Sequence, residues 1–566
     1  MKMNGARILL ECLKLEGVDT VFGYPGGTVI NLYDELFSFK GIRHILPRHE
    51  QAGVHAADGF ARATGKVGVA IATSGPGATN TVTGIATAYM DSIPLVVITG
   101  QVPTPLIGND AFQEVDIIGI TRPCTKHNFL VRDVKELAGI MKKAFYIARS
   151  GRPGPVLIDF PKDVQIATTD FKYPDTVDIR GYKPALEGHP KQVEKAVSMI
   201  LAAGKPLIYA GGGVVLGNAA DELTELAKML HIPVTTTLMG LGSFPEDDPL
   251  SLGLLGMHGT FYANMAVTST DLLVAVGARF DDRVTGKIAT FAPHAKIIHI
   301  DVDPTSIKKN VRVDLPIVGG VKQVLARMLK VLEAHPEKVA AFGNTLAPWL
   351  HEIEGWKEKH PLTYKHVTNV IKPQFVIQTL RKLSDDDAIV TTDVGQHQMW
   401  TAQFFQFTRP RTLLSSGGLG TMGYGLPAAI GAQAAFPGRQ VIAICGDGGF
   451  QMNLQELATL VQNRLPVKVC IMNNNFLGMV RQWQELFFEK RYSQTAMELP
   501  IDFIKLAEAF GAVGFQATKP HEVEDVIKQG FNTPGPVVME FKVAREEKVL
   551  PMVPVGASLN EMVLNA

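Results

Sequence analysis

Asp447 and Asn474 are the pair of residues in this chain best suited to binding a divalent cation. Asp447 lies in a Gly-Asp-Gly tripeptide, and Asn474 is the middle residue of three consecutive asparagines. A carboxylate and an amide oxygen, beside glycines that let backbone approach closely, suit Mg²⁺ shared with ligand phosphates. Taken alone, either motif is more typical of a plain turn or loop. Their spacing across one structural unit favours the metal.

The residues around this pair predict two parallel strands joined by a helix. VIAIC (441–445) and VKVCIM (467–472) are short apolar runs rich in β-branched residues, as in buried strands. Residues 451–464 carry apolar residues at helical spacing. A strand–helix–strand crossover makes the strands parallel. Asp447 and Asn474 would then both follow carboxyl ends of strands, where open α/β sheets bind ligands.

The length of 566 residues is too great for one core and predicts about three domains. Strand-like runs such as VGVAIAT and DLLVAV alternate with helical segments, which predicts an α/β fold with three doubly wound parallel-sheet domains. Polar, proline-bearing stretches are interpreted as linkers at 166–190 and 336–370. The expected domains are 1–165, 191–335 and 371–550, with a C-terminal tail at 551–566.

The bulk composition argues against several classes of partner. Lys+Arg and Asp+Glu both number 55, so a net charge of zero gives no electrostatic case for nucleic acid or an anionic membrane. No apolar run reaches the roughly 18 residues of a spanning helix, and the N-terminus resembles an amphipathic helix rather than a secretory signal. Four scattered cysteines predict free thiols in a reducing cytoplasm.

Three further segments carry candidate ligand-binding groups. Glu50 falls in the first turn of an alanine-rich helix predicted at 50–63, where it could also simply interact with the helix dipole. Gly395-Gln396-His397 follows the strand AIVTTD, and backbone amides there could bind phosphate. In the middle of the chain, AGGGVVLGN (210–218) is a weak dinucleotide motif. Asp301 follows a strand, where a carboxylate can accept ribose hydroxyls.

The Gly-Asp-Gly and asparagine motifs together resemble the signature of thiamine diphosphate enzymes. This resemblance implies that Asp447 and Asn474 bind Mg²⁺ through side chains and Phe476 through its carbonyl. It implies that Glu50, within RHEQ, hydrogen-bonds the cofactor's pyrimidine, and that Met422 supports the bent cofactor. In that family the pyrimidine-binding domain of one subunit faces the diphosphate-binding domain of another, so an obligate dimer is expected.

Nearly the whole chain resembles the catalytic subunits of the acetohydroxyacid synthase (acetolactate synthase) family. The matching motifs are YPGG (24–27), SGPGATN (74–80), AFQE (111–114), PKDV (161–164), GARFDDRVTG (277–286) and GMVRQWQ (478–484). The resemblance implies FAD-binding residues at Arg152, Gly212, Gly213, Met257, His258, Gly259, Gly277, Arg279, Asp301 and Asp303. It implies residues that bind thiamine diphosphate at Gly395, Gln396, His397, Met422, Gly446, Gly448, Gly449 and Met479.

Catalytic and substrate-binding positions follow from the same resemblance. Gly27, Gln113 and Lys162 join Glu50 as catalytic residues, and Arg279, Trp483, Gln113 and Lys162 are expected to bind substrate. Without the resemblance, ordinary structural roles would be favoured for several of them. Lys162 could be a surface lysine, Arg279 a structural ion-pair residue, and Met479 with Trp483 a helical core stripe.

The expected reaction joins two 2-oxoacids with loss of CO₂. A first pyruvate is decarboxylated and a second pyruvate or 2-oxobutyrate accepts the two-carbon unit, giving 2-acetolactate or 2-aceto-2-hydroxybutyrate toward valine, leucine and isoleucine. The expected cofactors are thiamine diphosphate, Mg²⁺ and FAD. The expected assembly is a cytoplasmic homodimer or homotetramer with a small regulatory subunit. A flavin-dependent pyruvate oxidase, another thiamine diphosphate carboligase and a non-catalytic subunit are the alternatives.

Overall fold

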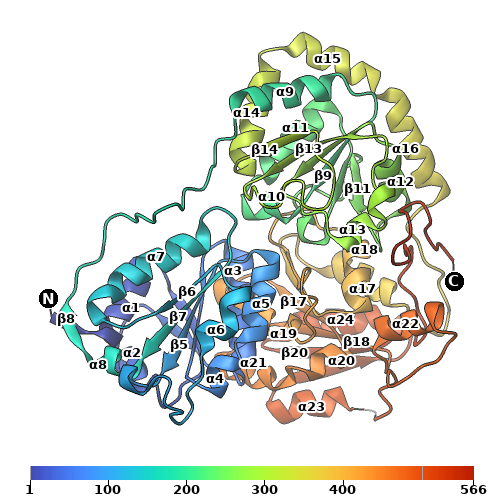
Figure 1. Ribbon diagram of the computed structural model, residues 1–566. Coiled ribbons are helices and arrows are strands. Elements are labelled where there is room, and N and C mark those ends of the chain that lie inside the picture. Colours follow the sequence, from blue (N-terminus) through green and yellow to red (C-terminus); the bar gives the residue numbers. More distant parts are fainter. Residues whose placement is uncertain (1, 500, 566) are drawn as a thin grey trace.

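Three α/β units make up the molecule, each built on a six-stranded sheet. The computed structural model describes residues 2–499 and 501–565. The N-terminal unit (2–170) and the C-terminal unit (371–549) lie side by side, and the middle unit (190–359) sits above both (Figure 1). All neighbouring strand pairs within these three sheets are parallel. The predicted α/β fold with three parallel sheets is therefore confirmed.

The N-terminal unit orders its sheet β3-β2-β4-β5-β7-β6, and β1 pairs antiparallel with β8 in a separate ribbon. Its strands are β1 (Lys2–Asn4), β2 (Thr20–Gly23), β3 (Arg43–Ile45), β4 (Gly68–Ala72), β5 (Leu95–Gln101), β6 (His127–Leu130), β7 (Pro155–Pro161) and β8 (Thr168–Asp170). Its helices are α1 (Gly5–Leu15), α2 (Ile30–Ser38), α3 (Glu50–Thr64), α4 (Pro76–Thr79), α5 (Val82–Asp91), η1 (Thr104–Leu106), α6 (Ile117–Thr121), η2 (Arg122–Cys124), η3 (Val134–Glu136), α7 (Leu137–Arg149) and α8 (Lys162–Ile166).

The middle unit orders its sheet β11-β10-β9-β12-β13-β14. Its strands are β9 (Pro206–Ala210), β10 (Val234–Thr236), β11 (Ser251–Leu254), β12 (Leu272–Val276), β13 (Lys296–Asp301) and β14 (Leu315–Val318). Its helices are α9 (Pro190–Leu201), α10 (Gly212–Leu216), α11 (Ala220–Leu230), η4 (Leu238–Gly240), α12 (Phe261–Ser269), α13 (Asp282–Thr285), η5 (Ile288–Thr290), α14 (Val321–Glu333), α15 (Pro336–Thr345) and α16 (Ala347–Lys359).

The C-terminal unit orders its sheet β16-β15-β17-β18-β20-β19. Its strands are β15 (Ile389–Thr392), β16 (Leu413–Leu414), β17 (Val441–Gly446), β18 (Lys468–Asn473), β19 (Val513–Ala517) and β20 (Val537–Lys542). Its helices are α17 (Pro373–Leu383), α18 (Gln396–Phe404), α19 (Gly425–Ala435), α20 (Asp447–Gln451), η6 (Leu454–Glu456), α21 (Leu457–Asn463), α22 (Gly478–Phe487), α23 (Phe503–Phe510), η7 (Pro520–Glu522) and α24 (Val523–Asn532).

Burial on both faces explains why β17 reads as a continuous apolar run. Val441, Ala443 and Cys445 face one hydrophobic cluster, whereas Ile442 and Ile444 face another on the opposite side of the sheet. This alternation is the two-residue period of a strand.

Helices α3 and α19 join the N-terminal and C-terminal units through very small residues. A Cβ atom at Gly59 would collide with the carbonyl oxygen of Ala428, and one at Gly431 would collide with that of Ala56. Beside this crossing, the Tyr424 hydroxyl donates to Asp58 Oδ1 at 2.6 Å. The two backbones can approach this closely only because side chains are almost absent at the crossing.

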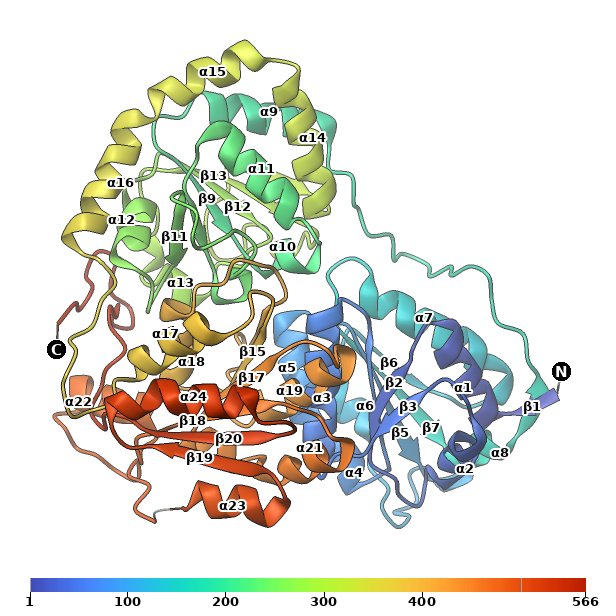
Figure 2. The ribbon, with the colours of Figure 1, turned by 180° about the vertical axis from the view of Figure 1, so that it is seen from behind.

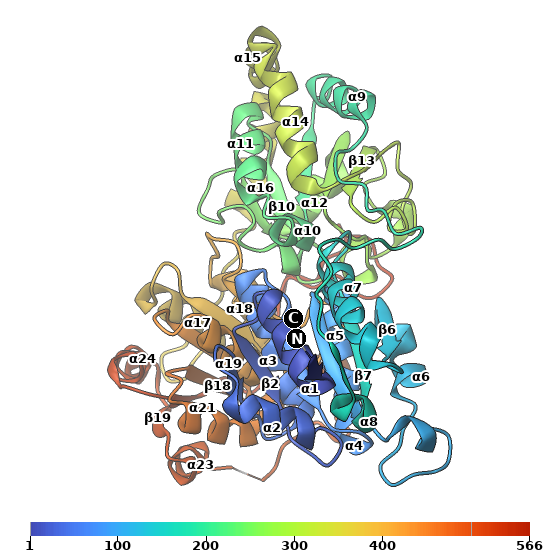
Figure 3. The ribbon, with the colours of Figure 1, turned by 90° about the vertical axis from the view of Figure 1, so that its left-hand side faces the viewer.

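Two connecting segments, 171–189 and 360–370, join the three units. Residues 171–189 pass from β8 to α9 in an extended path along one side (Figures 1 and 2). From the side, the middle unit lies above the other two and meets them at its lower end (Figure 3). The four cysteines are free thiols, as predicted. No helix in the described part of the chain is long and apolar enough to cross a bilayer.

The linker predicted at 336–370 is wrong over most of its length, because α15 and α16 occupy residues 336–359. Phe342 and Leu346 pack into one core of the middle unit, and Trp349 and Ile353 pack into the other. Trp349 Nε1 also donates to the carbonyl of Pro206 at 3.0 Å. The sequence of this segment therefore does contain apolar residues at helical spacing, among many charged residues.

Two other expectations need correction or completion. The helix predicted at 451–464 is broken, since α20 ends at Gln451 and α21 begins at Leu457. Asn453 leaves helical geometry, with φ −139°, and its side chain donates to the carbonyl of Gly423 at 2.7 Å. The tail packs on the middle unit, where Val553 is buried and its amide donates to the carbonyl of Met257.

Candidate functional site

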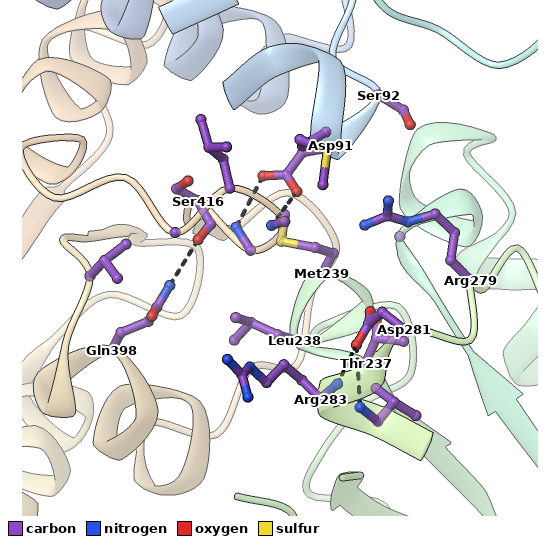
Figure 4. A pocket seen from close by; sticks show the side chains of 18 of the residues that line it. Asp91, Ser92, Thr237, Leu238, Met239, Arg279, Asp281, Arg283, Gln398 and Ser416 are labelled. Carbon is purple, nitrogen blue, oxygen red and sulfur yellow. Dashed lines mark hydrogen bonds between the residues drawn. The ribbon is translucent and has the colours of Figure 1, made fainter. Parts of the chain in front are cut away.

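A cavity of about 1130 Å³ lies where the three units meet. Figure 4 shows side chains from all three units around it. The sequence-predicted residues that line it are Arg152, Gly212, Gly213, Met257, His258, Gly277, Arg279, Asp301, Gly395, Gln396, His397, Met422, Gly446, Asp447, Gly448, Gly449, Asn474, Phe476, Met479 and Trp483. The predicted residues Glu50, Gly27, Gln113, Lys162, Gly259 and Asp303 are not part of this lining.

The candidate metal ligands sit at the ends of two neighbouring strands. β17 and β18 pair in parallel, with Gly446 opposite Met472, so Asp447 and Asn474 emerge at the same edge. Asn474 Oδ1 accepts the amide of Phe476 at 3.0 Å, and its Nδ2 donates to Gln396 Oε1 at 3.3 Å. These bonds set the orientation of the amide beside the cavity.

Burial raises the pKa of Asp447 to about 6, although backbone amides of residues 447, 474 and 448 lower it. No Lys, Arg or His of the described residues forms an ion pair with this carboxylate within 4 Å. A desolvated carboxylate without a close cation is stabilised by a bound cation. The donor set therefore fits Mg²⁺, which accepts few protein oxygens and keeps phosphate and water ligands.

His397 lies beside this pair with an unused ring nitrogen. Its Nε2 is buried and has no hydrogen-bond partner among residues 2–499 and 501–565, and its ring packs against Gly446 and Gly395. Burial lowers the pKa of His397 to about 4, and a backbone hydrogen bond with Asp393 opposes that shift. The ring is therefore neutral at pH 7. An anionic oxygen near Nε2 would give this nitrogen a partner and favour its protonation.

We expect binding of thiamine diphosphate to be accompanied by proton uptake at His397. The pKa of His397 is near 4 in the free protein, and a diphosphate would raise it, so affinity should increase as pH falls from 8 toward 7, a range in which Asp447, with its pKa of about 6, stays ionised. Calorimetry in two buffers with different ionisation enthalpies measures the uptake. His397→Asn should lose it, whereas the same uptake in that variant would contradict the assignment.

A buried aspartate from the N-terminal unit fixes the glycine-rich loop that leads to Met422. Asp91, at the end of α5, accepts the amides of Gly418 at 2.7 Å and Gly417 at 3.0 Å (Figure 4). Arg62 donates to the same carboxylate at 2.8 Å. The N-terminal unit therefore holds the loop of the C-terminal unit that brings Met422 to the cavity.

The middle unit presents a cradle of glycines to the cavity. The amide of Gly213 donates to the carbonyl of Gly277 at 2.9 Å, and Gly277 has φ +57°. A Cβ at Gly213 would collide with the Gly277 backbone, so neither position tolerates a side chain without rearrangement. Such a cradle fits a ligand that needs close backbone approach, as a dinucleotide does.

Two acidic residues flank this cradle in different roles. Asp301 lines the cavity, and burial raises its pKa to about 6. Asp303 lies outside the lining and instead holds Arg152, with Oδ2 at 3.2 Å from Nη1. Arg152 Nε also donates to Ser92 Oγ at 2.7 Å. Asp303 is thus placed to orient Arg152.

Arg283 is a cavity residue that the sequence prediction left out. Its guanidinium carbon lies 5.6 Å from the centroid of the Trp483 ring, and both residues line the cavity. Asp281 accepts the amides of Arg283 at 3.1 Å and Val284 at 3.2 Å, capping α13 (Figure 4). The signal was in GARFDDRVTG, where Arg283 is the second arginine.

Glu50 and its expected partners gather at another edge, the carboxyl ends of the N-terminal sheet. Glu50 begins α3 after β3, Lys162 directly follows β7, and Gly27 and Gln113 lie in loops after β2 and β5. Glu50 Oε2 accepts from Asn80 Nδ2 at 2.9 Å. Gln113 is exposed, with φ +56°. These four residues therefore lie at one edge of the N-terminal sheet, outside the cavity lining.

Comparisons with known proteins show the family to which the chain belongs. The thiamine pyrophosphate enzyme N-terminal TPP binding domain matches residues 3–120, the central domain 193–328, and the C-terminal TPP binding domain 393–541. The acetolactate synthase large subunit of Haemophilus influenzae is 48% identical over 100% of this chain and 98% of its own length. The isozyme 3 large subunit of Escherichia coli is also 48% identical, with 100% and 99% coverage.

A third relative, the acetolactate synthase large subunit of Parasynechococcus marenigrum, is 51% identical over 99% of this chain and 91% of its own length. This chain belongs to the acetolactate synthase large-subunit family of thiamine pyrophosphate enzymes. Asp447 lies in the C-terminal and Glu50 in the N-terminal TPP binding domain, and the glycine cradle lies in the central domain.

Proposed function

We propose that this chain is the catalytic subunit of an acetolactate synthase, acting on pyruvate and on a second 2-oxoacid. The observation that carries the proposal is the Arg283–Trp483 pair in the same cavity as Asp447 and Asn474. A guanidinium beside a flat apolar wall suits an acceptor with a carboxylate and a short alkyl group. An oxidase that passes electrons from one substrate has no need of such an acceptor site.

The cavity fits both expected cofactors. Asp447, Asn474 and the Phe476 carbonyl would hold Mg²⁺, and His397 Nε2 would gain a phosphate partner. The glycine cradle and Asp301 would take FAD in the middle unit. Thiamine diphosphate, when bound, supplies the electron sink for decarboxylation and carbon–carbon bond formation. FAD would serve a structural purpose, because joining two oxoacids involves no net electron transfer.

The residues of this chain then take distinct tasks. Glu50 would hold a proton at the pyrimidine nitrogen, because a carboxylic acid there can share it. Arg279 or Arg283 would bind the acceptor carboxylate, and Gln113 and Lys162 would approach the substrate from the same edge as Glu50. Met479 and Trp483 exclude water from the apolar side of the cavity.

The complete site needs two copies of the chain. Glu50 does not line its own chain's cavity, yet it lies at the ligand-binding edge of its sheet. We therefore propose that Glu50 of one copy completes the cavity of another, in a homodimer or homotetramer. The relatives are named large subunits, which supports a smaller regulatory partner for this chain as well.

One incubation tests the function. The protein is mixed with pyruvate, thiamine diphosphate, Mg²⁺ and FAD, and the products are analysed with the flavin spectrum. We expect 2-acetolactate, with no stoichiometric bleaching of flavin during turnover. Reduced flavin without acetolactate would favour the oxidase, and neither signal would favour a non-catalytic subunit.

Trp483→Leu should lower the ratio of acetohydroxybutyrate to acetolactate by roughly tenfold, since one methylene in an apolar pocket is worth about 10–200-fold in specificity. The indole would contact the extra carbon of 2-oxobutyrate and add little for pyruvate. Both acids are supplied together and both products quantified. Phe487→Leu is the matched control, because Phe487 packs edge-on against Trp483 at 5.9 Å but does not line the cavity. An unchanged product ratio would return Trp483 to a packing role.

A further inference from the structure

Glu540 is a fully buried carboxylate close to the candidate metal loop, which is residues 473–476. It lies on β20, opposite Ile471 of β18 and Gln516 of β19, and is 0% exposed. Burying an ionised carboxylate is costly unless it is paired and hydrogen-bonded. This desolvation cost indicates that Glu540 has a role beyond packing within the sheet.

Three donors from three strands satisfy Glu540. Asn473 Nδ2 and Lys542 Nζ reach Oε1 at 2.6 Å and 2.5 Å, and Gln516 Nε2 reaches Oε2 at 2.6 Å. The donor from Asn473 is the one that leads toward the cavity. Asn473 is 2% exposed and directly precedes the proposed ligand Asn474.

The other end of the Asn473 amide holds the loop itself. Its Oδ1 accepts the amide of Asn475 at 3.0 Å. Asn475 has φ +55°, a left-handed conformation that asparagine tolerates but that needs support. The carboxylate of Glu540 fixes the amide orientation, since only Nδ2 can donate to it, and this leaves Oδ1 to accept from Asn475.

We propose that Glu540 is a positioning residue, acting through Asn473 to hold residues 474–476 ready for a divalent cation. The proposal rests on the proposed metal site at Asp447 and Asn474. Groups that orient ligands in this way are typically worth about 10–100-fold in metal affinity. Glu540 itself binds no ligand, since it lies outside the cavity lining.

The test measures how Mg²⁺ supports thiamine diphosphate binding, by calorimetry on the full-length protein at a series of metal concentrations. Glu540→Leu, which removes the acceptor of Asn473 Nδ2, should require about 10–100-fold more Mg²⁺ while keeping its turnover at saturating metal. Gln516→Ala is the matched control, because it removes a hydrogen bond from the same carboxylate without touching Asn473. Its metal requirement should stay at the wild-type value. Equal metal requirements in all three proteins would overturn the proposal.

The effect of charge must be separated from the effect of positioning. Without the Glu540 carboxylate, Lys542 loses its ion-pair partner, and Lys542 also lowers the pKa of Asp447. In Glu540→Leu/Lys542→Gln the charges balance again. Positioning predicts that the metal requirement stays raised, and full recovery would overturn it in favour of electrostatics. If Glu540→Leu does not fold, Asn473→Ser breaks the same link and should show the same raised requirement.

A parallel titration of Asp447→Ala tests the proposed metal site separately from the positioning role of Glu540. If Asp447→Ala keeps wild-type, metal-dependent binding, the proposed metal site is wrong. If Asp447→Ala loses that binding while Glu540→Leu keeps it, the metal site stands and the positioning role of Glu540 is wrong.

Discussion

Glu50→Gln should lower turnover by roughly 10²–10⁴-fold, the usual worth of a positioned acid–base group, while thiamine diphosphate still binds. The amide keeps the shape of the side chain and its contact with Asn80, but it cannot share a proton with the pyrimidine. Calorimetry reports cofactor binding and product formation reports turnover. Glu35→Gln is a control, because Glu35 lies in the same unit and contacts Asn4 rather than the 74–80 turn. Wild-type turnover in Glu50→Gln would exclude the assignment.

The same variant can show which copy supplies Glu50. Mixed dimers of Glu50→Gln and Asp447→Ala chains would contain one site with both defects and one site with neither. Since half of randomly mixed dimers are of this kind, about a quarter of wild-type activity should return after mixing. If Glu50 served its own chain's cavity, every site would carry one defect and mixing would restore nothing.

Asp447→Ala should weaken metal and diphosphate binding together, because one ion bridges the carboxylate and the phosphates. The expected loss in Mg²⁺ affinity is at least roughly 100-fold, since even groups that only orient ligands are worth about 10–100-fold. Calorimetric titration of thiamine diphosphate with and without Mg²⁺ measures it.

Asp525→Ala removes an exposed carboxylate from the same unit and should leave both affinities unchanged. Metal-dependent affinity that survives in Asp447→Ala would disprove the ligand role. A comparable loss in Asp525→Ala would point to general destabilisation instead.

Much of the C-terminal site could be predicted because it depends on local order along the chain. Two apolar runs around a helical segment require parallel strands, and this alone brings Asp447 and Asn474 to one edge. The exact helix between them could not be predicted. Asn453 leaves the helix for a hydrogen bond to Gly423, a partner 30 residues away whose position depends on the folded loop.

Other features depended on contacts that no local pattern contains. The helical stripe of Phe342, Leu346, Trp349 and Ile353 was hidden among charged residues, and only the middle unit's two cores show what it packs against. The motif predicted Arg279 but not Arg283, because nothing in the motif itself distinguishes the two arginines. Only the folded chain shows that Arg283 also lines the cavity and lies beside Trp483. The role expected of Glu50 came from the resemblance, and the structure places Glu50 outside the cavity lining of its own chain.

The crossing of α3 and α19 has a mechanical consequence. With backbone pressed against backbone at Gly59 and Gly431, the N-terminal and C-terminal units cannot slide or tilt against one another without separating the helices entirely. The middle unit meets them through 171–189, 360–370, the packed tail and side-chain contacts such as Arg411 to the carbonyl of Val215 and Arg152 to Asp303. The lower two units are therefore joined backbone to backbone, whereas the middle unit is joined to them through side chains and connecting segments. Hydrogen exchange should accordingly be slow in α3 and α19 and faster along the two connecting segments.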